Sequence, residues 1–297
     1  MGLDSGQLAA LQAVVDEGSF EAAARALHIT PSAVSQRIKA LEQAAGQVLV
    51  RRTRPCQPTE AGRPLVRLAS QLALLEREAL DAARGPLDGQ QARTRIAVVV
   101  NADSLATWFL RALAQLPNDL AYCFDLQQDD QDHTADLLRD GSVMAAVTAQ
   151  RVAVQGCRVH RLGAMRYLAM ASPELHRTHF AATDTTSALA TAPMLQLDRK
   201  DKLQHRFVNK LTRRRLDPPI HYVPAVSAFI EAVRLGLGWG MVPERTARED
   251  MAAGRLVEIA PGRHLDTPLY WQSWRLESTA LATLTSAVQA AAATALR

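Results

Sequence analysis

Apolar residues recur at helical spacing through the first 46 residues of the chain. The pattern predicts three helices, each with one apolar face, over residues 5–17, 20–27 and 31–45. Ser19 and Thr30 stand where the second and third helices need N-terminal caps, and Pro31 takes a first helical position, where its missing N–H costs nothing. Gly18 and Gly46 follow helices as left-handed stops.

The polar face of the third predicted helix carries side chains suited to DNA. Small hydroxyls, an amide and one cation share this face: Ser32, Ser35, Gln36 and Lys39. Such groups suit the major groove, because hydroxyls bind phosphates or base edges and an amide can bind adenine. For one isolated helix, an ordinary solvated face is the alternative. The succession of a short helix, a tight turn and this helix favours a helix-turn-helix domain.

A short basic segment follows the third helix. Residues 48–50 predict a strand, and the turn after it contains three arginines: Arg51, Arg52 and Arg54. Residues 19–67 hold eight Lys or Arg against three Asp or Glu, whereas residues 94–297 hold 23 and 20. A run of charge is usually just solvated surface. Directly after a recognition-type helix, it is better interpreted as a wing that binds the DNA backbone.

The next predicted helix has the pattern of a coiled coil. Thr59 is its expected N-cap. Apolar residues follow at alternating steps of four and three, in a seam made of Ala61, Leu65, Leu68, Leu72, Leu75, Ala79 and Ala82. Packing inside one domain is the alternative. A paired helix would give a dimer with two recognition helices about one DNA turn, or a multiple of it, apart, and hence a pseudo-palindromic operator. Gly85-Pro86 and residues 88–93 predict a hinge.

Beyond residue 94 the pattern changes to strands that alternate with helices. Strands are predicted over residues 96–100, 120–126, 143–147, 167–171, 194–197, 220–223 and 241–243. Helices include residues 104–116, 134–140, 229–235 and 281–296. Repeated βα units predict a mainly parallel sheet and, by their recurrence, two similar lobes. Glycines between residues 236 and 240 follow a helix, not a strand, so they predict a tight turn and no dinucleotide-binding loop.

Polar residues cluster where the predicted strands end, which is where open α/β sheets bind ligands. The candidate effector-binding residues are Asn101, Asp103, Ser104, Asp129, Asp130, Thr148, Asp198, Ser227 and Phe229. Helix N-termini would hold a carboxylate and aspartates an amino group, so we expect a zwitterion with an extra positive charge. The alternative is that Asp103 and Ser104 only cap a helix, and that residues 129–132 form a solvated loop.

Composition and motifs narrow the classes of function. With 48% hydrophobic and 22% charged residues, the chain is typical of a globular protein. Cys56, Cys123 and Cys157 are scattered, which predicts reduced thiols and a cytoplasmic location. His176 and His179 lack a third metal ligand. The sequence has no catalytic motif such as G-x-S-x-G, so we expect no catalytic residues, no metal and no cofactor, and it has no apolar run that predicts a membrane partner.

The N-terminal residues resemble the winged helix-turn-helix of LysR-type transcriptional regulators. The resemblance rests on residues 22–42, AAARALHITPSAVSQRIKALE, and on residues 59–62, TEAG. It implies DNA contacts from the residues at the family's contact positions: Pro31, Ser32, Ser35, Gln36 and Arg54. We add Lys39, Arg51 and Arg52, whose charge suits phosphates.

Segments farther along resemble one subgroup of that family. Residues 100–108, 236–243, 260–262 and 269–271 are similar to regulators that respond to lysine and arginine and control their export, the ArgP/LysG kind. The resemblance implies an effector domain that folds like a periplasmic binding protein, with crossings between lobes near Gly163 and Asp266. It also implies that effector binding reorients a dimer or tetramer on DNA. The choice among lysine, arginine and another effector stays open.

Together these features predict an α/β protein with an N-terminal all-α winged helix-turn-helix, a long linker helix and a two-lobed effector domain. The expected boundaries are 1–58, 59–93 and 94–297, with lobe I at 94–163 and 267–297 and lobe II at 164–266. The expected partners are double-stranded DNA, a basic amino acid and further copies of the chain, and RNA polymerase is a further candidate. The alternatives are a LysR-type regulator of another small-molecule pathway, an enzyme on the α/β half, and a nucleoid-type coating protein.

Overall fold

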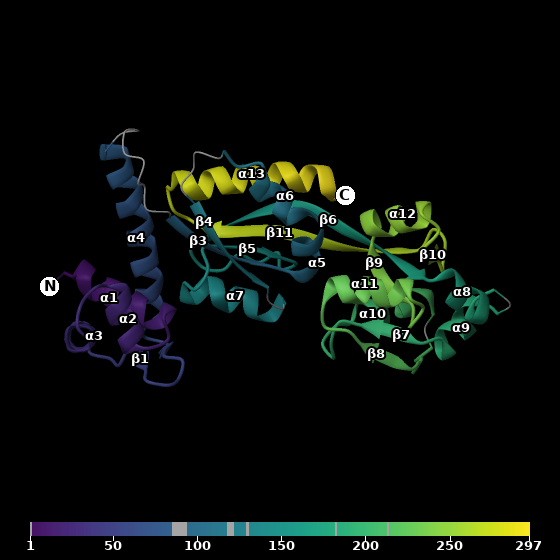
Figure 1. Cartoon of the computed structure of the whole chain (residues 1–297), viewed down its shortest axis with the longest axis horizontal. Coiled ribbons are helices and arrows are strands. Elements are labelled where there is room, and N and C mark those ends of the chain that lie inside the picture. Colours follow the sequence, from purple (N-terminus) through teal and green to yellow (C-terminus); the bar gives the residue numbers. More distant parts are fainter. Residues whose placement is uncertain (1, 85–93, 118–121, 129–130, 182, 213) are drawn as a thin grey trace. The chain divides into compact units, whose positions relative to one another are not determined.

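The computed structural model describes residues 2–84, 94–117, 122–128, 131–181, 183–212 and 214–297 (Figure 1). Contacts divide the chain into two compact units. The first unit comprises Met1–Val100, Gln115–His160 and Trp271–Ala287, and the second comprises Asn101–Ala114, Arg161–Tyr270 and Val288–Arg297. Our lobe boundaries, which follow chain order, remain a prediction. The hinge expected at Gly85-Pro86 and residues 88–93 lies outside the described residues.

Three helices form an N-terminal head, residues 5–62. They are α1 (Ser5–Asp16), α2 (Phe20–Ala26) and α3 (Pro31–Ala45). The predicted caps are confirmed: the Ser19 hydroxyl accepts the N–H of Ala22 at 3.1 Å, and the Thr30 hydroxyl accepts that of Ala33 at 3.2 Å. Gly46 ends α3 in the left-handed region, with φ of 67°. These caps set where α2 and α3 begin, and so which side chains of α3 are exposed.

A small apolar core holds the head together. Five large side chains are at most 1% exposed: Leu11, Val34, Ile38, Leu41 and Leu49. They belong to one cluster of buried residues, contributed by α1, α3 and the segment after α3. Burying such a side chain contributes about 1.5–3 kcal/mol. The short helix α2 contributes Ala23 and Ala24 to the same cluster, so its neighbours hold it in place.

The wing, residues 50–58, is a two-stranded ribbon. Its antiparallel strands are β1 (Val50–Arg51) and β2 (Gln57–Pro58). The ribbon begins two residues later than the predicted strand, because side chains bind the backbone just before it. The Leu49 N–H donates to the Glu42 carboxylate at 2.9 Å, and the Val48 carbonyl accepts the Thr59 hydroxyl at 2.7 Å. Backbone groups that bind side chains are not available to extend the ladder.

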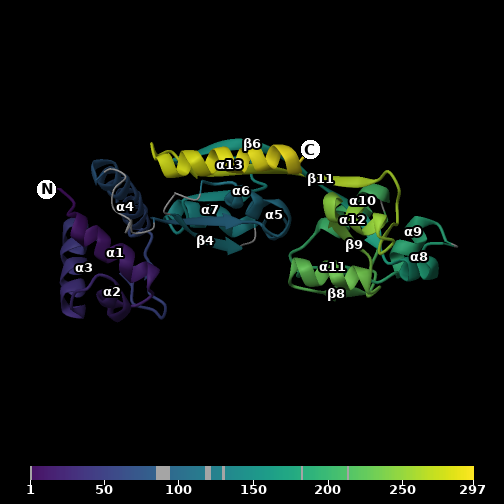
Figure 2. The same ribbon diagram turned by 45° about the horizontal axis from the view of Figure 1, so that its top comes forward.

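Helix α4 (Arg63–Arg84) begins later than expected and packs against α1 (Figures 1 and 2). Thr59 caps a turn before the helix, where its hydroxyl accepts the N–H of Gly62 at 3.0 Å. Its most buried face differs from the predicted seam and consists of Val66, Ala69, Ser70 and Leu74. In the seam, Leu65, Leu68, Leu72 and Leu75 are half-buried, and Ala79 and Ala82 are exposed. Pairing of this seam with a second chain remains a prediction.

The other contacts of α4 are made within the first unit. Arg67 donates to the backbone carbonyls of Gln155 at 2.8 Å and Gly156 at 2.9 Å. Glu78 accepts the Ser278 hydroxyl at 2.7 Å, at the start of the C-terminal helix. Polar side chains on α4 thus bind backbone and hydroxyl groups, and the heptad pattern does not predict these contacts.

Strand β3 is central to the first unit. The elements here are β3 (Thr94–Val100), β4 (Tyr122–Gln128), α7 (Gln131–Asp140) and β5 (Ala145–Thr148). β3 pairs in parallel with both β4 and β5, as predicted. The sheet has the strand order β10 (Val257–Glu258), β6 (Cys157–Ala171), β11 (His264–Trp274), β5, β3 and β4, and β9 (Gly240–Pro243) also pairs with β6. Among the described strands, β4 therefore ends this order, with one hydrogen-bonded neighbour.

The second unit and the remaining elements are less regular than predicted. They are α5 (Ala102–Ser104), the π-helix η1 (Leu105–Phe109), α6 (Leu110–Ala114), β6 (Cys157–Ala171), α8 (Pro173–His179), α9 (Thr185–Thr191), β7 (Met194–Gln196), α10 (Leu203–Leu211), β8 (Ile220–Tyr222), α11 (Val226–Arg234), β9 (Gly240–Pro243), α12 (Glu244–Ala252), β10 (Val257–Glu258), β11 (His264–Trp274) and α13 (Thr279–Ala295). β7 and β8 are parallel, but β6 pairs antiparallel with β9 and β10. The expectation of a mainly parallel sheet was wrong for these strands, because apolar runs do not encode direction.

Candidate DNA-binding surface and effector site

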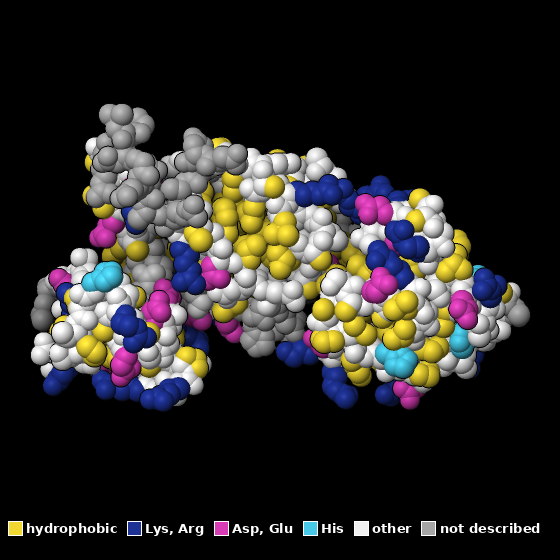
Figure 3. Space-filling model, in the orientation of Figure 1, with side chains coloured by type: hydrophobic (Ala, Val, Ile, Leu, Met, Phe, Trp, Pro, Cys, Tyr) yellow, Lys and Arg dark blue, Asp and Glu magenta, His cyan; other side chains and the backbone are white. Residues whose placement is uncertain are grey.

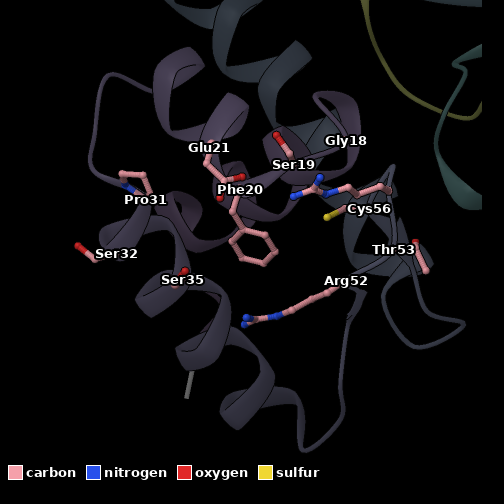
Figure 4. Close-up of a pocket in the computed structure, with 11 residues that line it drawn as sticks. Gly18, Ser19, Phe20, Glu21, Pro31, Ser32, Ser35, Arg52, Thr53 and Cys56 are labelled. Carbon is pink, nitrogen blue, oxygen red and sulfur yellow. The ribbon is translucent and has the colours of Figure 1, made fainter.

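A pocket of about 330 Å³ lies where α2, α3 and the wing meet (Figure 4). Five of the eight predicted DNA-binding residues line it: Pro31, Ser32, Ser35, Arg52 and Arg54. The sequence places these residues up to 23 positions apart, and the turn geometry of the head brings them to one surface. The remaining three, Gln36, Lys39 and Arg51, are exposed outside the lining. Whether these residues contact DNA remains a prediction.

Charge on the head is concentrated around the wing. Arg51, Arg52 and Arg54 are all exposed. Figure 3 shows Lys and Arg side chains gathered along the edge of the head near β1. An exposed cluster of arginines attracts phosphates over a range that the salt concentration sets by screening. Binding also releases counterions from DNA, so the affinity depends on salt.

The wing is fixed to the turn between α1 and α2. The Cys56 N–H donates to the Gly18 carbonyl at 2.8 Å, and the Thr53 hydroxyl donates to the Pro55 carbonyl at 2.7 Å. Gly18 has φ of 69°, and an added Cβ would lie 2.9 Å from Cβ of Pro55. A glycine is therefore required both by the backbone conformation and by the closeness of the wing.

In the second unit, Asp103 and Tyr167 form a short hydrogen bond. The Tyr167 hydroxyl donates to a carboxylate oxygen of Asp103 at 2.6 Å. Burial raises the pKa of Asp103, an effect that the hydrogen bond from Tyr167 opposes and the charge of Asp201 reinforces. Burial, together with the adjacent Asp103, raises the pKa of Tyr167 well above its ordinary value. The tyrosine therefore stays a donor, and the carboxylate is in an environment that disfavours its charge.

Three unpaired polar atoms lie within five residues of Asp103 along the chain, and a fourth lies on β11. Within the described residues, four buried atoms near α5 and on β11 lack a hydrogen-bond partner: Asn101 Oδ1, Ser104 Oγ, Trp108 Nε1 and Thr267 Oγ1. Buried polar groups are nearly always hydrogen-bonded, so such atoms need a further partner. The π-helix η1 follows directly after Ser104. π-helical turns are rare and are frequently found at functional sites.

The capping alternative for Asp103 and Ser104 was wrong. α5 begins after Asn101, with no side-chain hydrogen bond at the cap, and the Asp103 carboxylate binds Tyr167 instead. The Ser104 hydroxyl is the unpaired atom named above. Neither side chain therefore caps this helix.

The other predicted effector residues make different contacts. One Asp198 oxygen accepts the N–H groups of Lys200 and Asp201 at 2.7 and 2.9 Å, which forms a turn. Thr148 lies in the first unit, where its hydroxyl accepts the N–H of Gln150 at 3.1 Å. Ser227 is exposed, whereas Phe229 is 4% exposed in an apolar cluster that accounts for its position. Asp129 and Asp130 lie outside the described residues.

Two family models match almost the whole chain. Residues 5–63 match the bacterial regulatory helix-turn-helix proteins of the lysR family, and residues 87–293 match the LysR substrate binding domain. The chain belongs to the LysR family. The regulator LysG of Mycobacterium tuberculosis is 52% identical over 290 residues, which cover 98% of this chain and 94% of that protein.

Two solved structures extend the similarity of this LysR-family protein. ArgP from Mycobacterium tuberculosis has a TM-score of 0.89 at 51% identity, and the match covers 100% of this chain and 99% of that one. Full-length LysG from Corynebacterium glutamicum, with bound effector Arg, has a TM-score of 0.81 at 41% identity, with 99% of each chain covered. These similarities confirm the predicted family and fold.

Sequence reasoning missed several residues of this LysR-family site. Tyr167 was predicted only as a strand residue and Thr267 was assigned to no element, because nothing in their neighbourhood marks a binding role. Phe20 read only as a core residue of α2, although its ring also faces the Arg52 guanidinium. In the described ranges, no cluster of three His, Cys, Asp or Glu side chains could hold a metal ion, and no helix is long and apolar enough to span a membrane.

Proposed function

We propose that this LysR-family regulator binds a basic amino acid, lysine or arginine, through Asp103, and that the bound effector changes how the dimer or tetramer engages a pseudo-palindromic operator. The observation that carries the proposal is the Asp103–Tyr167 pair, on a stretch of chain that also holds the unpaired buried atoms of Asn101, Ser104 and Trp108. The bound arginine in the related LysG structure supports the class of ligand.

Asp103 has no positively charged partner among the described residues, which favours a cationic ligand. Among the described residues, Asp103 forms no ion pair with Lys or Arg, and the charged group that acts on its carboxylate is the like-charged Asp201. A half-buried carboxylate gains most from a partner that brings both positive charge and N–H donors. The ammonium of lysine or the guanidinium of arginine supplies both. Asn101 and Ser104 offer polar atoms for the amino-acid end of the ligand.

A comparison of charged and neutral ligands tests this proposal. Calorimetric titration of the wild type should give measurable binding of arginine or lysine and much weaker binding of citrulline and norleucine. A hydrogen bond to a charged group contributes about 1.5–3 kcal/mol, so Asp103→Asn should weaken the basic amino acid by roughly 10- to 150-fold and spare citrulline. Asp217→Asn removes an exposed carboxylate from the same unit and is the matched control. Equal losses for arginine and citrulline, or no loss, would exclude Asp103 as the cation receptor.

Self-association is part of the same proposal. β4 ends the strand order of its sheet, and its apolar side chains at Tyr122, Phe124 and Leu126 are only half-buried. The seam of α4 is likewise half-exposed. Both features suit a protein whose working form contains further copies of the chain. We place its action in the cytoplasm, where its DNA target lies, and assign it no catalytic role.

A LysR-type regulator of another small-molecule pathway is the second candidate. The unpaired atoms at Asn101, Ser104 and Thr267 favour it as much as they favour a basic amino acid, since any polar ligand could satisfy them. A thermal-shift screen of metabolites separates the two: stabilisation by lysine or arginine supports the first, and stabilisation only by uncharged or anionic compounds supports the second.

A further inference from the structure

We propose that Phe20 is a positioning residue for DNA binding, because its ring holds the Arg52 guanidinium in place between the wing and α3. Arg52 Cζ lies 4.8 Å from the centroid of the Phe20 ring. Both residues line the pocket between α2, α3 and the wing. In Figure 4 the Arg52 side chain extends from the wing so that its guanidinium ends beside the ring. The inference rests on the proposed contact of Arg52 with DNA.

The Phe20 ring is chemically suited to orient the Arg52 guanidinium. A guanidinium that stacks on an aromatic ring uses its face, and its five N–H donors point outward along its edge. A carboxylate partner would instead occupy those donors. The Glu21 carboxylate also lines the pocket, yet no ion pair joins it to Arg52 within the described part of the chain. Arg52 is thus oriented before DNA arrives, and its donors remain open to a phosphate.

The position of Phe20 depends on the cap of α2. Ser19 caps the helix, so Phe20 is its first residue and is only half-buried, with part of the ring left for Arg52. The rest of the side chain packs against the apolar cluster of the head. A long arginine side chain loses conformational freedom when it binds, and a partner that limits this freedom beforehand reduces the loss.

A double-mutant cycle tests the inference. Phe20→Leu keeps the apolar packing and removes the ring, and Arg52→Ala removes the guanidinium. We expect Phe20→Leu to weaken binding of operator DNA by about two- to fivefold when Arg52 is present, as for an exposed cation–π contact, and to have no effect in the Arg52→Ala background. Phe20→Tyr retains the ring face and should restore wild-type affinity.

The outcomes separate this inference from the proposed function. If Arg52→Ala alone leaves DNA affinity and its salt dependence unchanged, the assumed DNA contact of Arg52 is wrong. If Arg52→Ala weakens binding but Phe20→Leu costs the same in both backgrounds, Phe20 acts only through packing and the inference is overturned. Melting temperatures of all four proteins show whether the head remains folded, and filter binding at several salt concentrations provides the affinities.

Discussion

Gly62 lies so close to the backbone of Leu49, just before the wing, that no residue with a side chain could take its place. A Cβ added at this position would lie 2.1 Å from the Leu49 carbonyl oxygen and 3.0 Å from its carbon. Both atoms are backbone, so no rotamer change can relieve the overlap. The same Leu49 carbonyl accepts the N–H of Thr59 at 2.9 Å. Gly62→Ala must therefore displace either the start of α4 or the segment that leads into the wing.

The expected cost combines two terms. Overpacking a close-packed site costs about 1–3 kcal/mol, and weakening the hydrogen bond between Thr59 and Leu49 adds about 1 kcal/mol. We therefore expect Gly62→Ala to lower the free energy of unfolding of the head by about 2–4 kcal/mol. DNA binding should weaken in parallel, because the wing and α3 would lose their fixed spacing.

The assay can observe the head separately from the rest of the chain. All four tryptophans lie beyond residue 100, so their fluorescence reports on the part of the chain after the head and, through Trp274 beside Arg67, on its contact with α4. Hydrogen exchange of the amides in α1, α2 and α3 should accelerate in Gly62→Ala, while tryptophan fluorescence during urea unfolding should change little. Gly6→Ala is the control, since its Cβ would meet only side-chain atoms, the nearest at 3.2 Å. Unchanged exchange in Gly62→Ala would show that the close approach is not a constraint.

Three further predictions concern binding. Burial raises the pKa of Asp103 and a bound cation would lower it, so effector affinity should rise as pH increases through that raised pKa, with proton release on binding. In calorimetric titrations at several pH values, Asp103→Asn should remove this dependence. Gln36→Ala should reduce discrimination at one base pair by about 1–3 kcal/mol, whereas Arg54→Ala should weaken operator and random DNA alike, as gel shifts on both would show. Leu72→Glu should shift the protein towards monomer in analytical ultracentrifugation, since it places a charge in the half-exposed seam; an unchanged sedimentation coefficient would exclude the seam.

Local signals in the sequence predicted the head well. Ser19, Thr30, Pro31 and Gly46 set helix ends through bonds that span only a few residues, so their meaning does not depend on the rest of the fold. The strand directions around β6 were beyond such reasoning, because an apolar run has the same pattern in either direction. The late start of α4 after Thr59 has a similar cause, since the turn depends on contacts with Val48 and not on spacing.

The effector site was predicted only in part, for a reason of distance along the chain. Asp103 and Ser104 were identified from their place after a strand, but Tyr167 follows Asp103 by 64 residues and has no distinguishing neighbours. The π-helix after Ser104 was also missed. Its pattern of apolar residues is compatible with an ordinary α-helix, and only the backbone hydrogen bonds reveal the difference.

The bond from Cys56 to Gly18 limits which DNA sequences the head can accommodate. A wing attached to the turn before α2 cannot lengthen or shorten its reach independently of α3. The separation between the base pairs that we expect α3 to meet and the DNA backbone that we expect the arginines to meet is then a constant of each half-site. Operators with one base pair inserted inside a half-site should lose affinity sharply, even when every contacted base is kept.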